Sequence, residues 1–183
     1  MTRSAPHPWH GTPVEGARAV VVGVVPGQSP RVVRAAAEVA GRLGANLVCV
    51  WSDTSRTFVG TQEDGSLVTT PLDPDHVDAS DEVTADAELG AQVAEHLSGY
   101  AGPWRFVYTV GEATHVLAAA AREHDAWMIA VGSRRSGLGG WMNHLVGGST
   151  AGRLAHTQPV PVTIVPQTPK ESPCPVRLTT TRA

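Results

Sequence analysis

The 183-residue sequence has little cysteine, no excess of positive charge and no long apolar run. Its 2 cysteines, Cys49 and Cys174, lie far apart, which excludes a disulfide framework and a cysteine metal site. With 14 Lys and Arg against 17 Asp and Glu, the formal net charge of -3 argues against a nucleic-acid binder held by bulk positive charge. No apolar run approaches the roughly 18 residues of a membrane span, and residues 1–16 lack the apolar core of a secretion signal. We therefore expect a cytoplasmic protein that binds neither nucleic acid nor membrane.

Several catalytic and ligand-binding signatures are also missing. No Gly-x-x-x-x-Gly-Lys-Ser/Thr phosphate loop occurs, and no Gly-x-Gly-x-x-Gly follows the first apolar run. No Gly-x-Ser-x-Gly turn presents a nucleophile, and no pair of histidines has the helical i, i+4 spacing of a metal site. The sequence points to no catalytic residue and no metal ligand. If the protein has any enzymatic activity, we expect no more than slow hydrolysis of ATP.

Acidic residues concentrate in one part of the chain. Residues 53–95 hold eleven Asp and Glu against a single basic residue, Arg56. Within this part, residues 52–80 are polar and contain two glycines and two prolines, which predicts a long loop. Exposure of a loop and of one helix face to solvent would explain this concentration of acidic residues. The alternative is that the acidic residues dock against a basic surface, as in a dimer.

Apolar strands alternate with helical segments between two proline-containing tails, residues 1–16 and 167–183. The tails have no periodic pattern, and we expect both to be disordered. Alternation of this kind predicts one α/β domain over residues 17–166, with a doubly wound five-stranded parallel sheet and helices on both faces. The predicted strands are 19–25, 46–51, 104–110, 127–131 and 160–165, and the predicted helices are 30–43, 80–97, 112–124 and 149–156.

Prolines mark the last predicted strand, Val160–Val165. Pro161 lies within it, and Pro159 and Pro166 flank it. Because proline cannot donate a ladder hydrogen bond, this strand belongs at a sheet edge. An unprotected edge invites pairing with a second chain, so we expect a homodimer through Val160–Val165.

Two glycine-containing loops follow predicted strand ends, one over residues 25–29 and one over residues 132–150. In an open parallel sheet, ligands bind beyond the carboxyl ends of the strands, where the strand order reverses. Glycine lets the backbone approach a phosphate closely, and the N-terminus of the following helix favours an anion. The hydroxyls of Ser149 and Thr150 add donors, and the paired arginines at 134 and 135 add charge-assisted bonds of about 1.5–3 kcal/mol.

The stretch from Val110 to Arg134 resembles the third strand end, helix and fourth strand of universal stress proteins. Val20–Val24 is similar to the first strand of that family, and Arg153–His156 followed by Pro159–Val165 is similar to its last helix and strand. The resemblance implies a five-stranded parallel sheet, a dimer through the last strand, and ATP binding through the pattern Gly-x2-Gly-x9-Gly-Ser/Thr.

In this sequence the pattern starts at Gly132 and ends at Gly148 and Ser149, whereas Arg135 stands at its second glycine. Gly137 is the next glycine along the loop. The acidic residue that follows the first strand in the family is replaced by Val25 or Pro26. The resemblance implies that glycines, serine and arginines hold the phosphates, and that residues after the first and second strands line the base or ribose. The candidate ligand-binding residues are Val24, Val25, Pro26, Val50, Gly132, Arg134, Arg135, Gly137, Gly148, Ser149 and Thr150.

These observations favour two functions. A universal-stress-type regulatory protein would bind ATP with magnesium, or another adenine nucleotide, without fast turnover. A nucleotide-free dimerisation and interaction module of the same fold is the alternative, favoured by the missing glycine and the missing acidic residue. A slow nucleotide hydrolase would need a metal-holding carboxylate beside the phosphates, and the sequence points to no such residue.

Overall fold

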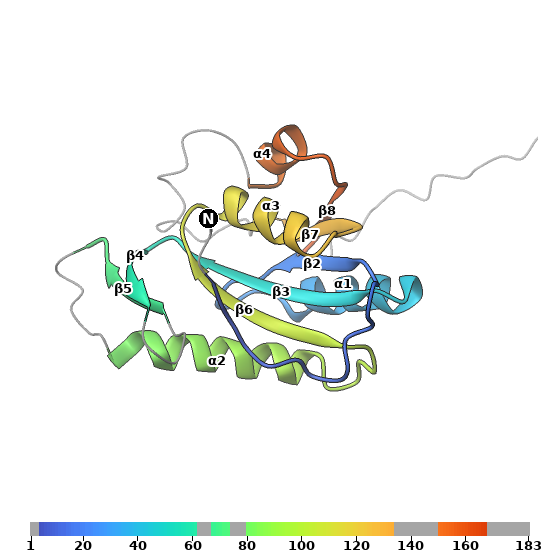
Figure 1. Cartoon of the computed structure of the whole chain (residues 1–183), viewed down its shortest axis with the longest axis horizontal. Coiled ribbons are helices and arrows are strands. Elements are labelled where there is room, and N and C mark those ends of the chain that lie inside the picture. The colour runs from blue at the N-terminus through green and yellow to red at the C-terminus, as the bar shows by residue number, and fades with distance from the viewer. Residues whose placement is uncertain (1–3, 62–66, 74–79, 134–149, 168–183) are drawn as a thin grey trace, which may run out of the picture.

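The computed structural model describes residues 4–61, 67–73, 80–133 and 150–167 and contains a six-stranded and a two-stranded sheet (Figure 1). The larger sheet has the strand order β1-β6-β3-β2-β7-β8. Five of its strands pair in parallel, which confirms the doubly wound five-stranded parallel sheet. The sixth, β1, pairs antiparallel with β6 and is absent from the sequence prediction. The elements are β1 (Ser4–Pro6), β2 (Ala19–Gly23), α1 (Pro30–Leu43), β3 (Asn46–Asp53), β4 (Arg56–Thr61), β5 (Leu67–Pro71), α2 (Ser80–His96), β6 (Trp104–Val110), α3 (Ala113–Glu123), β7 (Met128–Gly132), α4 (Thr150–Thr157) and β8 (Val162–Val165).

The first strand and helix form where the sequence predicts them. The first four residues of β2 are at most 2% exposed, because the strand is covered on both faces. Before α1, the side chain of Ser29 accepts a hydrogen bond from the backbone N–H of Arg31, and Pro30 occupies the first turn. The helix ends at Gly44, whose φ of 59° is a left-handed conformation that glycine adopts at low cost. Local signals therefore set both ends of α1.

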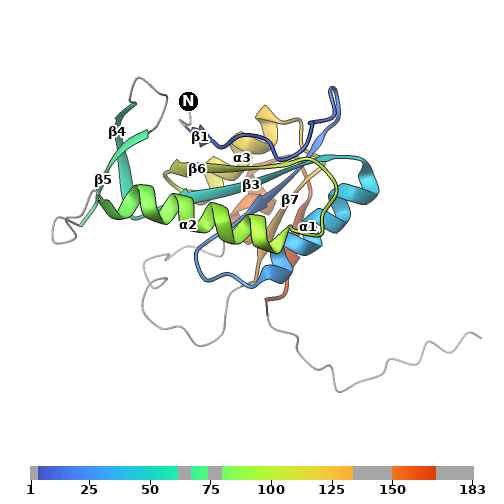
Figure 2. The ribbon, with the colours of Figure 1, turned by 90° about the horizontal axis from the view of Figure 1, so that it is seen from below.

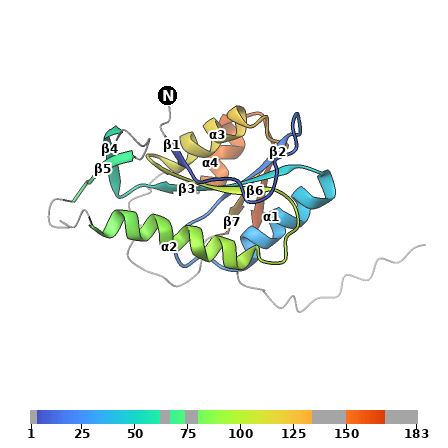
Figure 3. The ribbon, with the colours of Figure 1, turned by 60° about the horizontal axis from the view of Figure 1, so that its bottom comes forward.

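Helices cover both faces of the larger sheet (Figures 2 and 3). On one face, α1 and α2 contribute residues such as Val33 and Val93 to a core that also contains Val20 and Val22 of β2. On the other face, α3 and α4 pack through residues such as Leu154 into a core that contains Val21. Successive side chains of a strand point to opposite faces, so the single valine run of β2 serves both cores.

The first part of the N-terminal segment, residues 4–10, lies along β6, in contrast to the disordered tail expected over residues 1–16 (Figure 2). After β1, the backbone N–H of His7 donates to the carbonyl of Phe106 over 2.9 Å. His10 and Trp104 exchange two backbone hydrogen bonds, and their ring centroids are 3.9 Å apart in a stacked arrangement. Without this segment β6 would be an open sheet edge. An edge strand needs no buried apolar run and tolerates proline, which explains why composition alone suggests a tail.

Residues 52–80, predicted as a long acidic loop, contain strands. β3 continues to Asp53, and β4 and β5 form an antiparallel hairpin with a register shift between Phe58 and Gly60. Figure 1 shows this hairpin beside the carboxyl end of β3. The loop prediction is therefore wrong for the described part of this stretch. Half-buried and exposed residues alternate along β4, a strand signal that the acidic flanks obscure. α2 begins at Ser80, as predicted.

The last described elements in chain order are α4 and β8, followed by residues up to Gln167. β8 pairs only with β7 in the larger sheet, which confirms the edge position predicted from the prolines. Residues 168–183 of the predicted C-terminal tail lie outside the described residues, whereas Gln167 is held by hydrogen bonds to Ser133 and Ser29. Within the described ranges, no helix combines the length and apolarity that crossing a bilayer requires.

Candidate functional site

The order of the larger sheet reverses between β2 and β7. From β2 the chain passes through α1 to β3 on one side, whereas β7 and β8 lie on the other side. The carboxyl ends of these strands, Gly23 in β2 and Gly132 in β7, meet at this switch point, and α1 begins there. Ligands of open parallel sheets bind in the crevice outside such a point. The two loops selected from the sequence both leave strands at this crevice.

The loop between β2 and α1 carries three of the candidate residues. The backbone N–H of Val24 donates to the carbonyl of Val50 over 2.9 Å, so the structure brings these two candidates together. Their side chains are 3% and 2% exposed and belong to the cores on opposite faces of the sheet. Val25 and Pro26 are exposed at the rim. Of these four candidates, only Val25 and Pro26 therefore have exposed side chains, and the side chains of Val24 and Val50 belong to the core.

Gly132, the first glycine of the predicted pattern, is crowded by two glutamine side chains. A Cβ atom added at Gly132 would lie 2.8 Å from Nε2 of Gln167 and 3.0 Å from Nε2 of Gln28. Gln28 is anchored within its own loop, because its Nε2 donates to the carbonyl of Gly23 over 3.3 Å. We refer to Gln28 and Gln167 as the glutamine pair. Its amide ends occupy the space that a glycine at this position leaves open.

Gln167 connects the end of β8 to two other elements at the switch point. Its backbone N–H donates to Oγ of Ser133 over 3.1 Å, and its Nε2 donates to the carbonyl of Ser133 over 2.6 Å. Its Oε1 accepts a hydrogen bond from the backbone N–H of Ser29 over 3.3 Å, at the start of α1. Sequence reasoning missed both members of the glutamine pair, because neither belongs to a periodic pattern or a motif.

The loop after β7 falls mainly outside the described residues. Ser133 and Thr150 flank that stretch, and Thr150 is the half-buried first residue of α4. The roles assigned to the candidate phosphate-binding residues in between therefore stay predictions. These residues are Arg134, Arg135, Gly137, Gly148 and Ser149.

Glu112 follows β6 at the same edge of the sheet and links α3 to α4. Its carboxylate accepts from the backbone N–H of His115 over 3.1 Å, and its Oε1 lies 3.2 Å from Nη1 of Arg153. Partial burial alone would raise the pKa of Glu112. Hydrogen bonds from Thr114 and His115, with the charge of Arg153, outweigh this effect and hold the pKa below its ordinary value. Because these groups engage the carboxylate, we assign Glu112 a structural role rather than metal binding.

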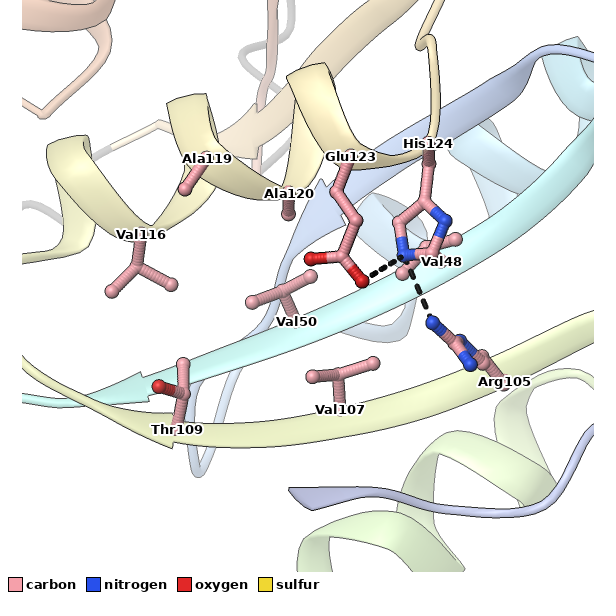
Figure 4. A pocket seen from close by; sticks show the side chains of 10 residues that line it. All are labelled: Val48, Val50, Arg105, Val107, Thr109, Val116, Ala119, Ala120, Glu123 and His124. Atoms are coloured by element: carbon pink, nitrogen blue, oxygen red, sulfur yellow. Dashed lines mark hydrogen bonds and ion pairs between the residues drawn. The ribbon is translucent and has the colours of Figure 1, made fainter. Parts of the chain in front are cut away.

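A small pocket lies between α3 and strands β3 and β6 (Figure 4). Its volume of about 20 Å³ suits one water molecule. At one end, Nη2 of Arg105 lies 3.0 Å from Nε2 of His124, which must accept because a guanidinium only donates. Burial and the charge of Arg105 lower the pKa of His124, which favours this neutral ring. The pocket is too small for a nucleotide. Arg105 lies at the start of β6, whereas Gly132 lies at the end of the parallel strand β7, so this end of the pocket is at the opposite edge of the sheet from Gly132.

Cys49, in β3, is fully buried, and burial raises the pKa of its thiol. The thiol therefore stays protonated and behaves as a small apolar side chain. Among the described residues, no three His, Cys, Asp or Glu side chains gather in a way that could hold a metal ion.

The fold defines a doubly wound α/β domain whose switch point brings together Gly23, Gly132 and the start of α1. Residues 16–166 match the family model described as the universal stress protein family. The match spans most of the 183 residues, and the chain belongs to the universal stress protein family.

Solved structures support the same fold. A universal stress protein from Archaeoglobus fulgidus has 20% identity and a TM-score of 0.54, over 80% of this chain and 97% of that chain. A complex of the universal stress protein from this organism with dAMP has 18% identity and a TM-score of 0.53, over 80% and 96%. A universal stress protein in complex with cAMP has 20% identity and a TM-score of 0.53, over 83% and 98%. At these identities the likeness shows the fold alone. Comparison with curated protein sequences gives no significant match.

Proposed function

We propose that this protein is a universal-stress-type regulator that binds an adenine nucleotide at the carboxyl ends of β2 and β7. The observation that carries the proposal is the position of Gly132 at the switch point, where Gln167 beside it also bonds to the backbone N–H of Ser29 at the start of α1. Two of the similar solved structures are described as complexes with dAMP and cAMP, both adenine nucleotides. ATP with magnesium remains the finer expectation within this class.

The residues around Gly132 suit a ligand that has both charge and polar groups. The backbone N–H of Ser29, which now bonds to the neutral amide of Gln167, and the positive end of the α1 dipole favour an anion. Gly132 leaves a space that movable amide ends now fill. Val25 and Pro26 offer exposed side chains at the rim for the base or ribose. We keep, as candidates for the phosphates, Arg134, Arg135, Gly137, Gly148, Ser149 and Thr150.

Slow turnover is part of the proposal. Glu112, a carboxylate at this edge of the sheet, is engaged by the N-terminus of α3 and by Arg153. Val25 and Pro26 stand where the family has an acidic residue. We therefore assign no residue to activate a water for hydrolysis, and the protein acts by binding rather than by catalysis.

One observation favours the second candidate function, a nucleotide-free interaction module of the same fold. The glutamine pair fills the space over Gly132 with the protein's own atoms. If this arrangement were permanent, no nucleotide could contact Gly132. The two candidates thus differ in whether the pair gives way to a ligand.

Titration of the full chain with AMP, followed by amide NMR, separates these candidates. We expect the amide signals of Ser29, Gly132 and Ser133 to shift saturably, because these groups line the crevice. The signals of Asp125 and Ala126, at the opposite end of β7, should stay in place. GMP at the same concentration is the control for recognition of the base. The absence of a saturable shift would favour the nucleotide-free module, and shifts confined to the Asp125 end would contradict the site.

We also propose a homodimer through β8, which begins at Val162 and so forms only the last four residues of the predicted Val160–Val165 strand. β8 is one of the two edge strands of the larger sheet, the other being the three-residue β1, and β8 has no outer neighbour among the described strands. Thr163 is exposed, and Ile164 is 54% exposed, so the edge offers both backbone groups and an apolar side chain. These features suit pairing with a second copy of the chain.

Replacing Ile164 with aspartate should convert the dimer largely to monomer, since the variant places a charge in the proposed interface. Sedimentation velocity at micromolar concentration measures the change. Val59→Asp is the matched control, because Val59 is a β-branched residue that is 61% exposed on β4, away from β8. A dimer unchanged by Ile164→Asp, or a wild-type monomer, would reject this interface.

A further inference from the structure

We infer that Gln167 is an internal occupant of the crevice at Gly132, and that a bound nucleotide must displace it. The inference rests on the proposed function and adds a regulatory element to it. Gln167 lies two residues after β8 in the chain. Its side chain contacts the ends of two other elements, β7 and α1, that form the switch point.

The side-chain amide of Gln167 hydrogen-bonds to one backbone donor and one backbone acceptor beside Gly132. Its Oε1 accepts from the backbone N–H of Ser29, and its Nε2 donates to the carbonyl of Ser133. The hydrogen bond from its own backbone N–H to Oγ of Ser133 fixes the direction in which the side chain leaves β8. The amide group therefore makes the polar contacts that a ligand would otherwise make at these atoms.

A phosphate is a stronger partner than Gln167 for the N–H of Ser29. This N–H lies at the start of α1, where the positive end of the helix dipole favours negative charge. The amide of Gln167 is neutral, and charge-assisted hydrogen bonds are roughly twice as strong as neutral ones. An anionic ligand that reaches Ser29 gains more from the contact than Gln167 loses there.

Gln167 and a ligand at Gly132 cannot occupy the crevice together. Nε2 of Gln167 lies only 2.8 Å from the position of an added Cβ at Gly132, and Nε2 of Gln28 lies 3.0 Å from it. Both atoms are the ends of flexible side chains, which rotate away without a shift of the sheet. Gln28 is bonded within its own loop, whereas Gln167 comes from a different strand end. We therefore assign the gating role to Gln167.

Calorimetric titration of the full chain with AMP tests this role. Gln167→Ala should bind AMP about tenfold more tightly than the wild type, because apparent affinity is reduced by the fraction of molecules whose site is closed. Gln158→Ala is the matched control. It truncates the same side chain at the other end of β8, where the amide bonds only to backbone atoms of Val160 in the described structure. Its affinity for AMP should equal that of the wild type.

Hydrogen exchange without nucleotide gives a second readout. The amide of Ser29 should exchange at least several-fold faster in Gln167→Ala than in the wild type or in Gln158→Ala, since its acceptor is removed. Equal AMP affinities for wild type and Gln167→Ala, or unchanged exchange at Ser29, would overturn the gating role of Gln167. As long as these proteins bind AMP, the proposed function would still stand. Failure of all three proteins to bind millimolar AMP would overturn the proposed function, and the gate with it.

Discussion

Replacing Phe106 with alanine should lower the free energy of unfolding by about 3–5 kcal/mol. Phe106 lies in the middle of β6 and is 1% exposed. Its ring is 5.1 Å from the ring of His7, centroid to centroid, and it packs against Gly90 of α2. One side chain therefore joins the N-terminal segment, the sheet and a helix. Its truncation removes buried apolar surface and leaves a cavity that a glycine on the facing helix does not fill.

Urea denaturation followed by circular dichroism measures this loss. Phe58→Ala is the matched control, because Phe58 is only half-buried on the β4–β5 hairpin. We expect its effect to be clearly smaller than that of Phe106→Ala. A loss below about 1 kcal/mol for Phe106→Ala, in the range of ordinary surface substitutions, would show that the N-terminal segment and α2 do not pack on β6 as described.

The parallel sheet could be predicted because its signals are local. The valine run of β2 marks a strand buried on both faces, and β6 was predicted with the bounds that the structure has, Trp104–Val110. Ser29 and Pro30 mark the start of α1, and Gly44 marks its end. Each signal depends on residues that are close in the sequence, so no knowledge of the tertiary partners is needed.

The N-terminal segment could not be predicted in the same way, because distant partners hold it. β1 pairs with β6 about a hundred residues later in the chain. Nε2 of His7 lies 3.1 Å from the carboxylate of Asp86 on α2. The backbone N–H of Val14 donates to the side-chain carbonyl of Asn46 over 2.9 Å, and the Asn46 amide donates back to the Val14 carbonyl. None of these pairings leaves a periodic pattern in residues 4–16.

The sequence could predict where the two candidate loops lie in the fold, whereas their role in ligand binding stays a prediction. The strand order brings Gly132 to the start of α1, as the two loops suggested. Two of the candidates, Val24 and Val50, proved to be core side chains, because the strand run that precedes the loop is buried on both faces. Gln167 was assigned to a tail, since a glutamine beyond the last strand carries no motif. Its place became visible only through its contacts with Ser29 and Ser133.

A saturating adenine nucleotide should stabilise the protein strongly. At a hundred times the dissociation constant, a ligand that binds only the folded state adds about 2.7 kcal/mol to the free energy of unfolding. For a chain of this length, that corresponds to a rise of about 5 to 11 °C in the midpoint of thermal unfolding. The reason is mass action alone, so the rise should grow with the logarithm of the nucleotide concentration once the site is saturated.

Thermal melting of the full chain with AMP, and in parallel with ATP and magnesium, is the measurement that tests nucleotide binding most directly. GMP at equal concentration controls for general effects of a phosphate anion. The account predicts a concentration-dependent rise in the midpoint with at least one adenine nucleotide and a smaller rise with GMP. Identical melting curves with and without millimolar AMP and ATP would contradict it, and would leave the nucleotide-free interaction module as the function of this fold.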